Sequence, residues 1–202
     1  GGNDYWRGTC VYEKQFAAPQ RPECSRVYLQ FNGVNASAKV ILNGETVATH
    51  DGGYSTFRCD ITDVLKPENH LIVEVDNSVN DRVYPQKADF TFYGGIYRNV
   101  KLITVNRHHF DMDHFGGPGI AVTPVMQDND CDTAVEVFVT NKLDSHKIRY
   151  TLLNAEGGVV ASHETPKTKM LFRIRNAHKW HGRKDPYLYS LKAELLDGDQ
   201  VI

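Results

Sequence analysis

The sequence has 202 residues, of which 41% are hydrophobic, and its 23 Lys and Arg against 25 Asp and Glu give a net charge of −2. That length suits one large β domain or two domains of about 100 residues, and either can bury a core. Both halves are close to neutral without a clustered basic face, and no apolar run approaches the roughly 20 residues of a membrane span. We therefore expect neither a nucleic-acid partner nor a membrane-spanning segment.

Apolar residues alternate with polar ones along most of the chain, with a period of two. The stretches 26–31, 71–75 and 135–139 each place their apolar residues on one face, which predicts half-buried strands. Asn43-Gly44 lies between two such runs and predicts a tight hairpin, because both central residues of a type I′ turn need positive φ. No segment has the period of an amphipathic helix, so the predicted fold class is all-β.

Alternation is lost between residues 105 and 118, which predicts a domain boundary and two sandwiches, 1–107 and 108–202. The second sandwich has six predicted strands: 119–126, 132–140, 147–154, 158–163, 168–176 and 187–196. A short segment, QVI, follows the Asp197-Gly198 turn. An immunoglobulin-like sandwich needs about seven strands, so we expect the last strand to be missing or incomplete and to leave an unpaired edge.

Four cysteines are scattered without the Cys-x-x-Cys spacing of a zinc or redox site: Cys10, Cys24, Cys59 and Cys131. We expect buried free thiols, which favour a reducing bacterial cytoplasm, while a periplasmic or secreted location stays open. The opening residues GGNDYWRG lack the charged and apolar regions of a signal peptide, although one could precede residue 1.

The most distinctive segments are Phe31–Ile61 and Asp89–Val100 in the first sandwich, and Trp180 with the Pro186–Tyr189 run in the second. Together they resemble the N-terminal half of glycoside hydrolase family two, which contains β-galactosidases, β-glucuronidases and β-mannosidases. The resemblance extends from Trp6 to Ile202. It implies a jelly-roll sugar-binding domain and an immunoglobulin-like domain, which in the family precede the (β/α)₈ barrel that carries the chemistry.

The sequence offers no evident catalytic pair of carboxylates. Glycoside hydrolysis needs two, about 5 Å apart for retention and roughly 6.5–9.5 Å for inversion. The resemblance implies a retaining mechanism whose acid/base lies in an Asn-Glu dipeptide of the barrel, and this sequence contains no Asn-Glu dipeptide. We therefore expect no catalytic residue, metal or cofactor in the chain, and no hydrolysis by the chain alone.

The resemblance implies a non-catalytic fragment of an exo-β-glycosidase, with a β-galactosidase acting on terminal β-D-galactosides as the first hypothesis. Its sandwiches would shape the substrate pocket and brace the barrel of the same chain, in a parent enzyme expected to be a homo-oligomer. Two alternatives stay open. The parent is a β-glucuronidase or β-mannosidase, or the chain is a free-standing carbohydrate-binding or adhesion module.

The resemblance also implies three substrate-binding residues: Asp89, Asn3 and Asp4. Asp89 precedes the Gly-Ile-aromatic-Arg run on a loop expected to reach the mouth of the barrel. A carboxylate there can accept hydrogen bonds from adjacent sugar hydroxyls, and aromatic faces offer a flat apolar wall. The alternative is that Asp89 caps a turn while Phe90, Phe92 and Tyr93 fill the core of the loop.

Other conspicuous residues have structural interpretations. Gly94-Gly95 predicts a sharp bend with a close backbone approach, and Arg98 is expected to pair with a loop acid. Trp6 and Trp180 are expected in the cores of their sandwiches, although Trp6 could also serve as a sugar platform. The histidines near residues 108–114, and those beside Trp180, are expected to lie in connecting segments and not in a metal site.

Overall fold

The computed structural model describes residues 6–86, 88 and 92–202, and every regular element among them is a β-strand. This confirms the all-β fold class. The chain divides into two compact units: Gly1–Asn106 with Phe115–Gly117, and Arg107–His114 with Pro118–Ile202. No helix in the described part is long and apolar enough to cross a membrane.

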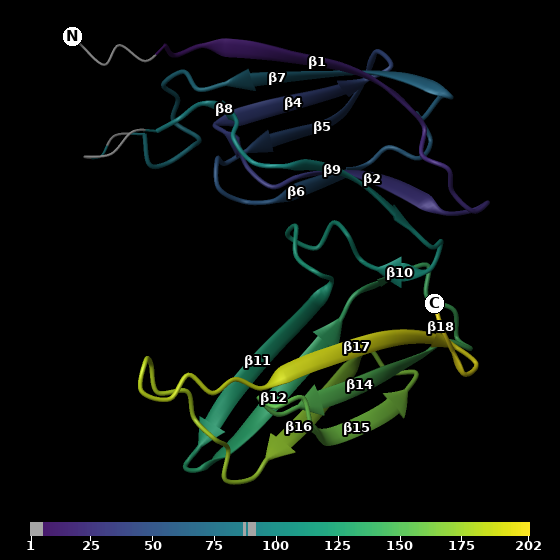
Figure 1. Ribbon diagram of the computed structural model, residues 1–202, viewed down its shortest axis with the longest axis vertical. Helices are drawn as coiled ribbons and strands as arrows, with labels where there is room; N and C mark the ends of the chain where they lie inside the picture. The colour runs from purple at the N-terminus through teal and green to yellow at the C-terminus, as the bar shows by residue number, and fades with distance from the viewer. Residues whose placement is uncertain (1–5, 87, 89–91) are drawn as a thin grey trace. The chain divides into compact units, whose positions relative to one another are not determined.

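The first unit is built from two antiparallel sheets and one short strand pair (Figure 1). The four-stranded sheet has the order β1 (Thr9–Ala17), β7 (Glu68–Asp76), β4 (Ser37–Leu42), β5 (Glu45–Asp51). The three-stranded sheet has the order β6 (Phe57–Asp60), β2 (Arg26–Phe31), β9 (Val100–Val105). A two-residue pair joins β3 (Val34–Asn35) to β8 (Gly95–Ile96).

The predicted alternation builds the core between these sheets. Val27, Leu29 and Phe31 on β2 are all at most 2% exposed, and they belong to one cluster with the apolar residues of β4 and β7. The β4–β5 hairpin turns at Asn43 and Gly44, whose φ values of 53° and 91° confirm the predicted turn. The β4–β5 pairing shifts by one residue at a bulge between Val40 and Ile41, so the turn sets the register only on its own side of that bulge.

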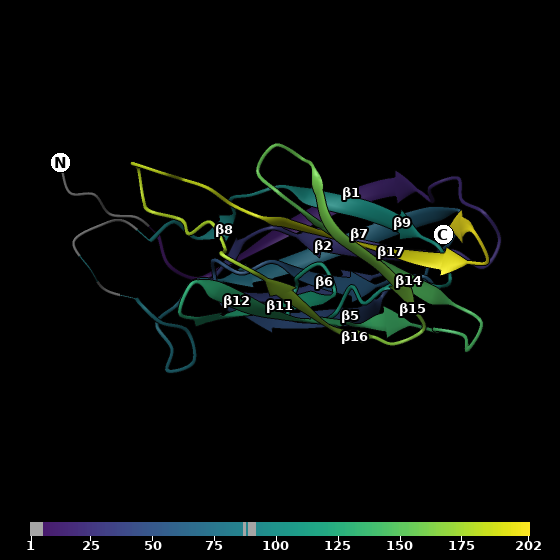
Figure 2. The same ribbon diagram turned by 90° about the horizontal axis from the view of Figure 1, so that it is seen from below.

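The second unit has a three-stranded and a four-stranded sheet, whose strands can be followed from two directions in Figures 1 and 2. The first sheet has the order β11 (Ile120–Gln127), β12 (Asp130–Val137), β16 (Lys169–Ile174). The second has the order β15 (Val159–Thr165), β14 (Lys147–Leu153), β17 (Ser190–Asp197), β18 (Gln200–Val201). A short pair joins β10 (His109–Phe110) to β13 (Val139–Thr140).

Two predicted strands of the second unit have different limits in the structure. The stretch 132–140 is split at Phe138, whose main chain bonds to Asp111 and Gly119 instead of continuing the β12 ladder. The strand predicted from residue 187 begins only at Ser190. The short segment after the Asp197-Gly198 turn is a strand, β18, which pairs with β17 through two residues.

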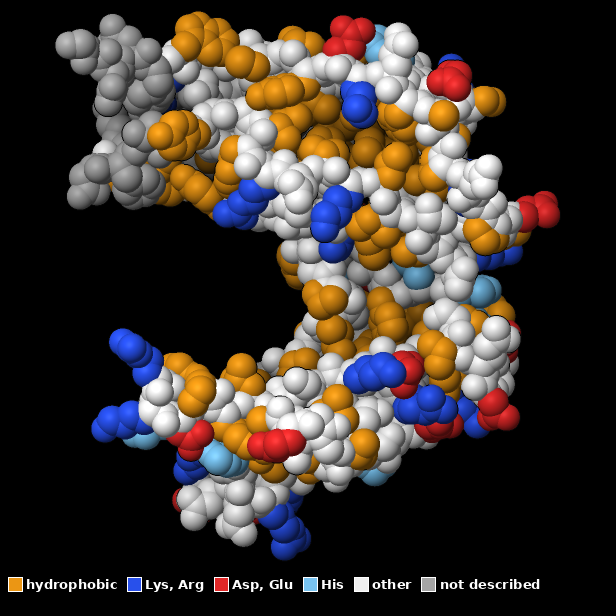
Figure 3. All heavy atoms as spheres, in the orientation of Figure 1, with side chains coloured by type: hydrophobic (Ala, Val, Ile, Leu, Met, Phe, Trp, Pro, Cys, Tyr) orange, Lys and Arg blue, Asp and Glu red, His pale blue; other side chains and the backbone are white. Residues whose placement is uncertain are grey.

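Part of the first sandwich's interior is exposed. β1 and β9 are edge strands of their sheets. The alternation places Tyr12, Val100 and Leu102 on the same faces as the core residues of β7 and β2, yet they are 39–41% exposed. Hydrophobic side chains are visible on the face of this unit shown in Figure 3.

The cysteines only partly follow the prediction of buried free thiols. All four are free, and two of them, Cys59 and Cys131, are buried within the two cores. Cys10 and Cys24 are exposed, so the prediction was wrong for these two. Cys10 lies on the exposed strand β1, where alternation alone does not ensure burial.

Candidate functional site

The candidate site is the end of the first sandwich where β1 begins and β7 ends, which we call the loop end. The three predicted substrate-binding residues lie outside the described residues: Asp89, Asn3 and Asp4. Their described neighbours are the segment Trp6–Gly8, which leads into β1, and the parts 77–86, 88 and 92–98 of the loop that leaves β7. Thr9 pairs with Asp76 in the sheet, so the structure brings these two segments together.

Asn77 connects the N-terminal segment to the start of the loop. Its main-chain N–H donates to the carbonyl oxygen of Gly8 at 3.3 Å, and its side-chain Oδ1 accepts from the Gly8 N–H at 2.8 Å. The Nδ2 of Asn77 donates to the carbonyl oxygen of Trp6 at 3.5 Å. A Cβ added to Gly94 would collide with the same amide, so the returning part of the loop packs directly on it.

A second amide, Gln86, organises the middle of the loop. Its Nε2 donates to the carbonyl oxygens of Asn80 at 2.5 Å and Val83 at 2.6 Å, and its Oε1 accepts from the Asn80 N–H at 3.1 Å. Arg7 donates to the main-chain carbonyl of Gln86 at 3.2 Å. Main-chain polar groups that have no strand partner are thus satisfied by side chains, as a partly buried loop requires.

The returning part of the loop is fixed by contacts to β3 and β1. Asn35, which is 8% exposed, donates from Nδ2 to the carbonyl oxygen of Tyr93 at 2.8 Å. Gly95 has a φ of 89°, and a Cβ added to it would collide with the hydroxyl of Tyr12. That hydroxyl accepts from the N–H of Ile96 at 3.3 Å. The predicted bend and close approach at the glycine pair are confirmed.

The residues after the glycine pair close the loop onto the turn between β5 and β6. The hydroxyl of Tyr97 donates to the carbonyl oxygen of Gly53 at 2.5 Å. Among the described residues, Arg98 donates to the carbonyl oxygens of Asn32 and Tyr54 at 3.4 and 3.3 Å and lies over the Tyr97 ring. The predicted pairing of Arg98 with a loop acid is not found among the described residues, where its hydrogen-bond partners are carbonyl oxygens.

The aromatic side chains of this region differ in burial. Phe92 is 6% exposed, as the loop-core interpretation predicts, but Tyr93 is 73% and Tyr84 74% exposed. Phe90 lies outside the described residues. Trp6 is 62% exposed, so its predicted burial in the core was wrong. The loop end therefore presents flat aromatic faces to its surroundings, which is the surface that the C–H groups of a pyranose ring can contact.

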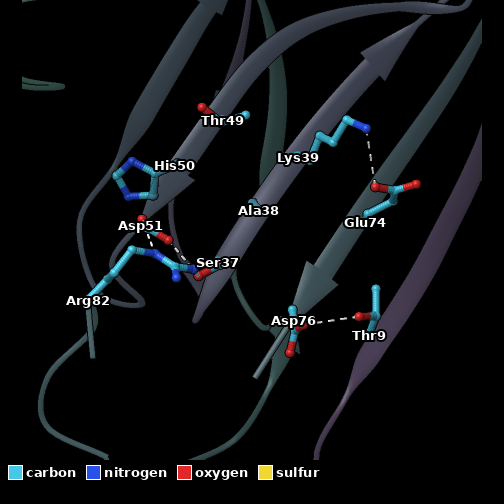
Figure 4. A pocket seen from close by; sticks show the side chains of 10 residues that line it. All are labelled: Thr9, Ser37, Ala38, Lys39, Thr49, His50, Asp51, Glu74, Asp76 and Arg82. Atoms are coloured by element: carbon cyan, nitrogen blue, oxygen red, sulfur yellow. Dashed lines mark hydrogen bonds and ion pairs between the residues drawn. The ribbon is translucent and has the colours of Figure 1, made fainter. Parts of the chain in front are cut away.

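A polar cavity of about 410 Å³ lies beside the loop end (Figure 4). It is lined by ten residues: Thr9, Ser37, Ala38, Lys39, Thr49, His50, Asp51, Glu74, Asp76 and Arg82. Four of its charged groups form two pairs, in which Asp51 accepts from Arg82 at 3.0 Å and Lys39 pairs with Glu74 at 3.7 Å. The third acid, Asp76, accepts from the hydroxyl of Thr9 at 3.1 Å. Because these partners already satisfy one another, a ligand would have to compete with them.

Hydrogen bonds favour the ionised form of two acids of this cavity, Asp51 and Asp76. A hydrogen bond from Ser37, followed by one from Arg82, lowers the pKa of Asp51, and hydrogen bonds from Ser78 lower the pKa of Asp76. A general acid for glycoside hydrolysis needs a raised pKa. Among the described acids with a resolved shift, every pKa is lowered, so none has the property of a catalytic proton donor.

The second unit has an apolar groove of about 640 Å³ between β11 and the segment that leads into β17. Its lining includes Val122, Met126, Trp180 and Leu188, which are 45–64% exposed. The prediction that Trp180 packs beneath the second sandwich was wrong, because its side chain lines this open groove.

The histidines do not form a metal site in the described part of the chain, where no group of three His, Cys, Asp or Glu residues could hold an ion. His108 contacts the carbonyl oxygen of Asn141 at 2.6 Å. His178 pairs with Asp185 at 2.6 Å and stacks on Tyr187. His109 lies in strand β10 and is 7% exposed, so the expectation that these histidines lie in connecting segments was wrong for it.

Comparison with protein families gives two matches that together cover most of the chain. A model described as "Glycosyl hydrolase 2 galactose-binding domain-like" matches residues 4–108, and "Glycosyl hydrolases family 2" matches residues 118–202. The chain belongs to glycoside hydrolase family 2. The resemblance found in the sequence is thereby confirmed.

Curated relatives of this family 2 chain have two different names. A "Putative beta-glucuronidase" of Formosa agariphila is 34% identical over 98% of the chain and 24% of the relative. A "Beta-galactosidase" of Thermoanaerobacter pseudethanolicus is 32% identical over 98% of the chain and 27% of the relative. The family 2 chain thus spans about a quarter of the length of these relatives.

The similar solved structures also include both a β-glucuronidase and a putative β-galactosidase. An FMN-binding β-glucuronidase from Facaelibacterium prausnitzii aligns with a TM-score of 0.90 and 39% identity, over 100% of the chain and 32% of that structure. A putative β-galactosidase from Bacteroides fragilis aligns with a TM-score of 0.88 and 34% identity, over 99% and 32%. The family 2 assignment is therefore firm, whereas the relatives leave the sugar undecided.

The sequence interpretation missed the residues that organise the loop end of this family 2 chain: Asn35, Asn77 and Gln86. The only signal available in the sequence is their type, because an amide can donate and accept at once and so can bond to two main-chain groups. Many other loop amides share that property. Their partners, 58 to 71 residues away for the two asparagines, become visible only in the fold.

Proposed function

We propose that this chain is a non-catalytic N-terminal part of a family 2 exo-β-glycosidase that acts with retention on terminal β-D-galactosides or β-D-glucuronides. In this proposal the first sandwich forms one wall of the substrate pocket through its loop end. The second sandwich supports a (β/α)₈ barrel that supplies both catalytic carboxylates. The substrate is a carbohydrate, and the partner of these sandwiches is the barrel of the same polypeptide.

The observation that carries the proposal is the extent of the matches. Nearly the whole chain aligns with named glycosidases, yet it spans only 24–27% of the two relatives described above. The lowered pKa values of Asp51 and Asp76 support the same division, because a catalytic proton donor needs a raised pKa. The exposed Tyr84 and Tyr93 support a role in sugar contact.

The experiment compares the full-length protein with the 202-residue chain on p-nitrophenyl β-D-galactoside and β-D-glucuronide. We expect the full-length protein to release nitrophenol from one of them with retention at the anomeric carbon, followed by NMR, and the chain alone to release none. Activity of the purified chain would contradict the non-catalytic assignment. Inactivity of the full-length protein on both substrates would contradict the proposed substrate class.

The second candidate is a carbohydrate-binding or adhesion module that works without a barrel. The exposed aromatic faces at the loop end favour some sugar contact, but a binding site needs several convergent polar groups to offset the cost of immobilising a ligand. Titration calorimetry of the chain with galactose, glucuronate and lactose separates the two. We expect no saturation at low-millimolar sugar, whereas a micromolar isotherm would favour the binding module.

A further inference from the structure

We propose that Asn77 is a positioning residue for sugar binding, whose side-chain amide fixes the segment Trp6–Gly8 against the two ends of the loop. The inference rests on the proposed function, since it assumes that the loop end borders the substrate. Asn77 lies outside the set of residues expected to touch the sugar. Its role is to hold the two chain segments from which those residues extend.

The contacts of Asn77 are concentrated on one short segment that is distant in the sequence. Gly8 is bonded twice, through its carbonyl oxygen to the Asn77 N–H at 3.3 Å and through its N–H to Oδ1 at 2.8 Å. Trp6 is bonded through its carbonyl oxygen to Nδ2. The ring of Trp6 also folds over Gly8, where an added Cβ would lie 2.6 Å from a ring carbon. The segment is therefore compact and is tied to Asn77 at both of its ends.

The same amide also meets the returning part of the loop. Gly94 approaches it so closely that no side chain fits between them. Asn77 opens the loop and Gly94 lies near its end, so the two ends of the loop and the N-terminal segment meet at one side chain. A small change in this amide is expected to shift all three segments together.

An amide suits this position better than its nearest alternatives. Gly8 offers an N–H and Trp6 a carbonyl oxygen, so the side chain between them must accept and donate at once, as an asparagine does. Aspartate keeps the acceptor for Gly8 but cannot donate to Trp6, and alanine loses both bonds. Asn77→Asp therefore removes one of the two side-chain hydrogen bonds, and Asn77→Ala removes both.

Asn43 provides a matched control in the same unit. Its Nδ2 donates to the carbonyl oxygen of Val64 at 2.8 Å, and its Oδ1 accepts from the N–H of His70 at 3.0 Å. It thus also joins distant main-chain groups through a side-chain amide. Strand β4 begins with Ser37 at the loop end. Asn43 follows the other end of this strand, at the β4–β5 turn, and so lies away from the loop end.

The kinetic test uses the full-length protein with the p-nitrophenyl glycoside that it cleaves. We expect Asn77→Ala to raise KM about tenfold or more while kcat changes less, because misplacing binding groups weakens substrate binding. Asn77→Asp should give an intermediate KM, which also serves if the alanine variant does not fold. Asn43→Ala should lower the thermal midpoint and leave KM within twofold. An unchanged KM in both Asn77 variants, or an equal rise in Asn43→Ala, would overturn the proposal.

A second measurement, on the 202-residue chain, separates this inference from the proposed function. The Gly8 N–H should exchange with deuterium at least tenfold faster in Asn77→Ala than in the unchanged chain, because its acceptor is gone. Asn43→Ala should leave that rate unchanged. Unchanged exchange in Asn77→Ala would overturn the inference directly. Faster exchange in Asn77→Ala would support the hydrogen bond between Gly8 and Asn77. If the full-length protein then cleaved neither glycoside, the proposed function would be refuted while this hydrogen bond would still be supported.

Discussion

Replacing Gly95 by alanine tests the close approach at the centre of the loop end. Two separate costs are expected. Gly95 has a φ of 89°, which an alanine adopts at a cost of about 1 kcal/mol in the free energy of unfolding. The new Cβ would also displace the Tyr12 hydroxyl and break its hydrogen bond to Ile96, which adds about 1 kcal/mol. Together the substitution should lower the free energy of unfolding by about 2 kcal/mol.

Gly44 is the matched control, because its φ of 91° is nearly the same and nothing lies within 4 Å of its added Cβ. Gly44→Ala should therefore cost only the backbone part, about 1 kcal/mol, in urea unfolding followed by circular dichroism. In a Tyr12→Phe background, Gly95→Ala should fall to the same value, since the displaced hydroxyl is absent. Equal costs for Gly95→Ala and Gly44→Ala in the unchanged chain would refute the contact with Tyr12.

Three further predictions concern the cores and the charges. Burial raises the pKa of Tyr150 to about 12, so its contribution to the free energy of unfolding is complete below pH 10 and is lost as pH rises toward 12. Urea unfolding at pH 9 and pH 11 should therefore show a smaller decrease in stability for Tyr150→Phe than for the unchanged chain. Burial alone would raise the pKa of Asp60, but hydrogen bonds from Thr62 and Arg26 outweigh it and lower the pKa. Asp60→Asn should therefore reduce stability at pH 7 and flatten its decrease below about pH 4, as seen by thermal melts across pH. Phe31→Ala should lower the free energy of unfolding by about 3–5 kcal/mol in urea, because Phe31 is fully buried and stacks on another ring at 4.8 Å.

The sequence predicted those features of the fold that depend on local chemistry. Asn43-Gly44 specifies its own turn, because few residues tolerate positive φ twice in succession. The alternation in β2 specifies which face is buried, and the structure buries that face. The predicted burial of Trp6 and Trp180 was wrong because it depended on which other parts of the chain cover these side chains. Hydrophobicity states what a side chain gains by burial, but whether another element covers it depends on the fold.

The candidate site was harder to predict because its framework is polar. The number of aromatics between residues 84 and 100 suggested a loop held by ring packing. Among the described ones, however, Tyr84 and Tyr93 are exposed, and the main chain of the loop is held largely by side-chain amides. A segment outside the sheets must find partners for its N–H and C=O groups, and an amide satisfies both kinds at once. Such a framework leaves aromatic faces open to a ligand or a neighbouring domain. The residues that set the loop and those that contact a sugar would then be different, so Asn77 can be changed without removing any predicted sugar contact.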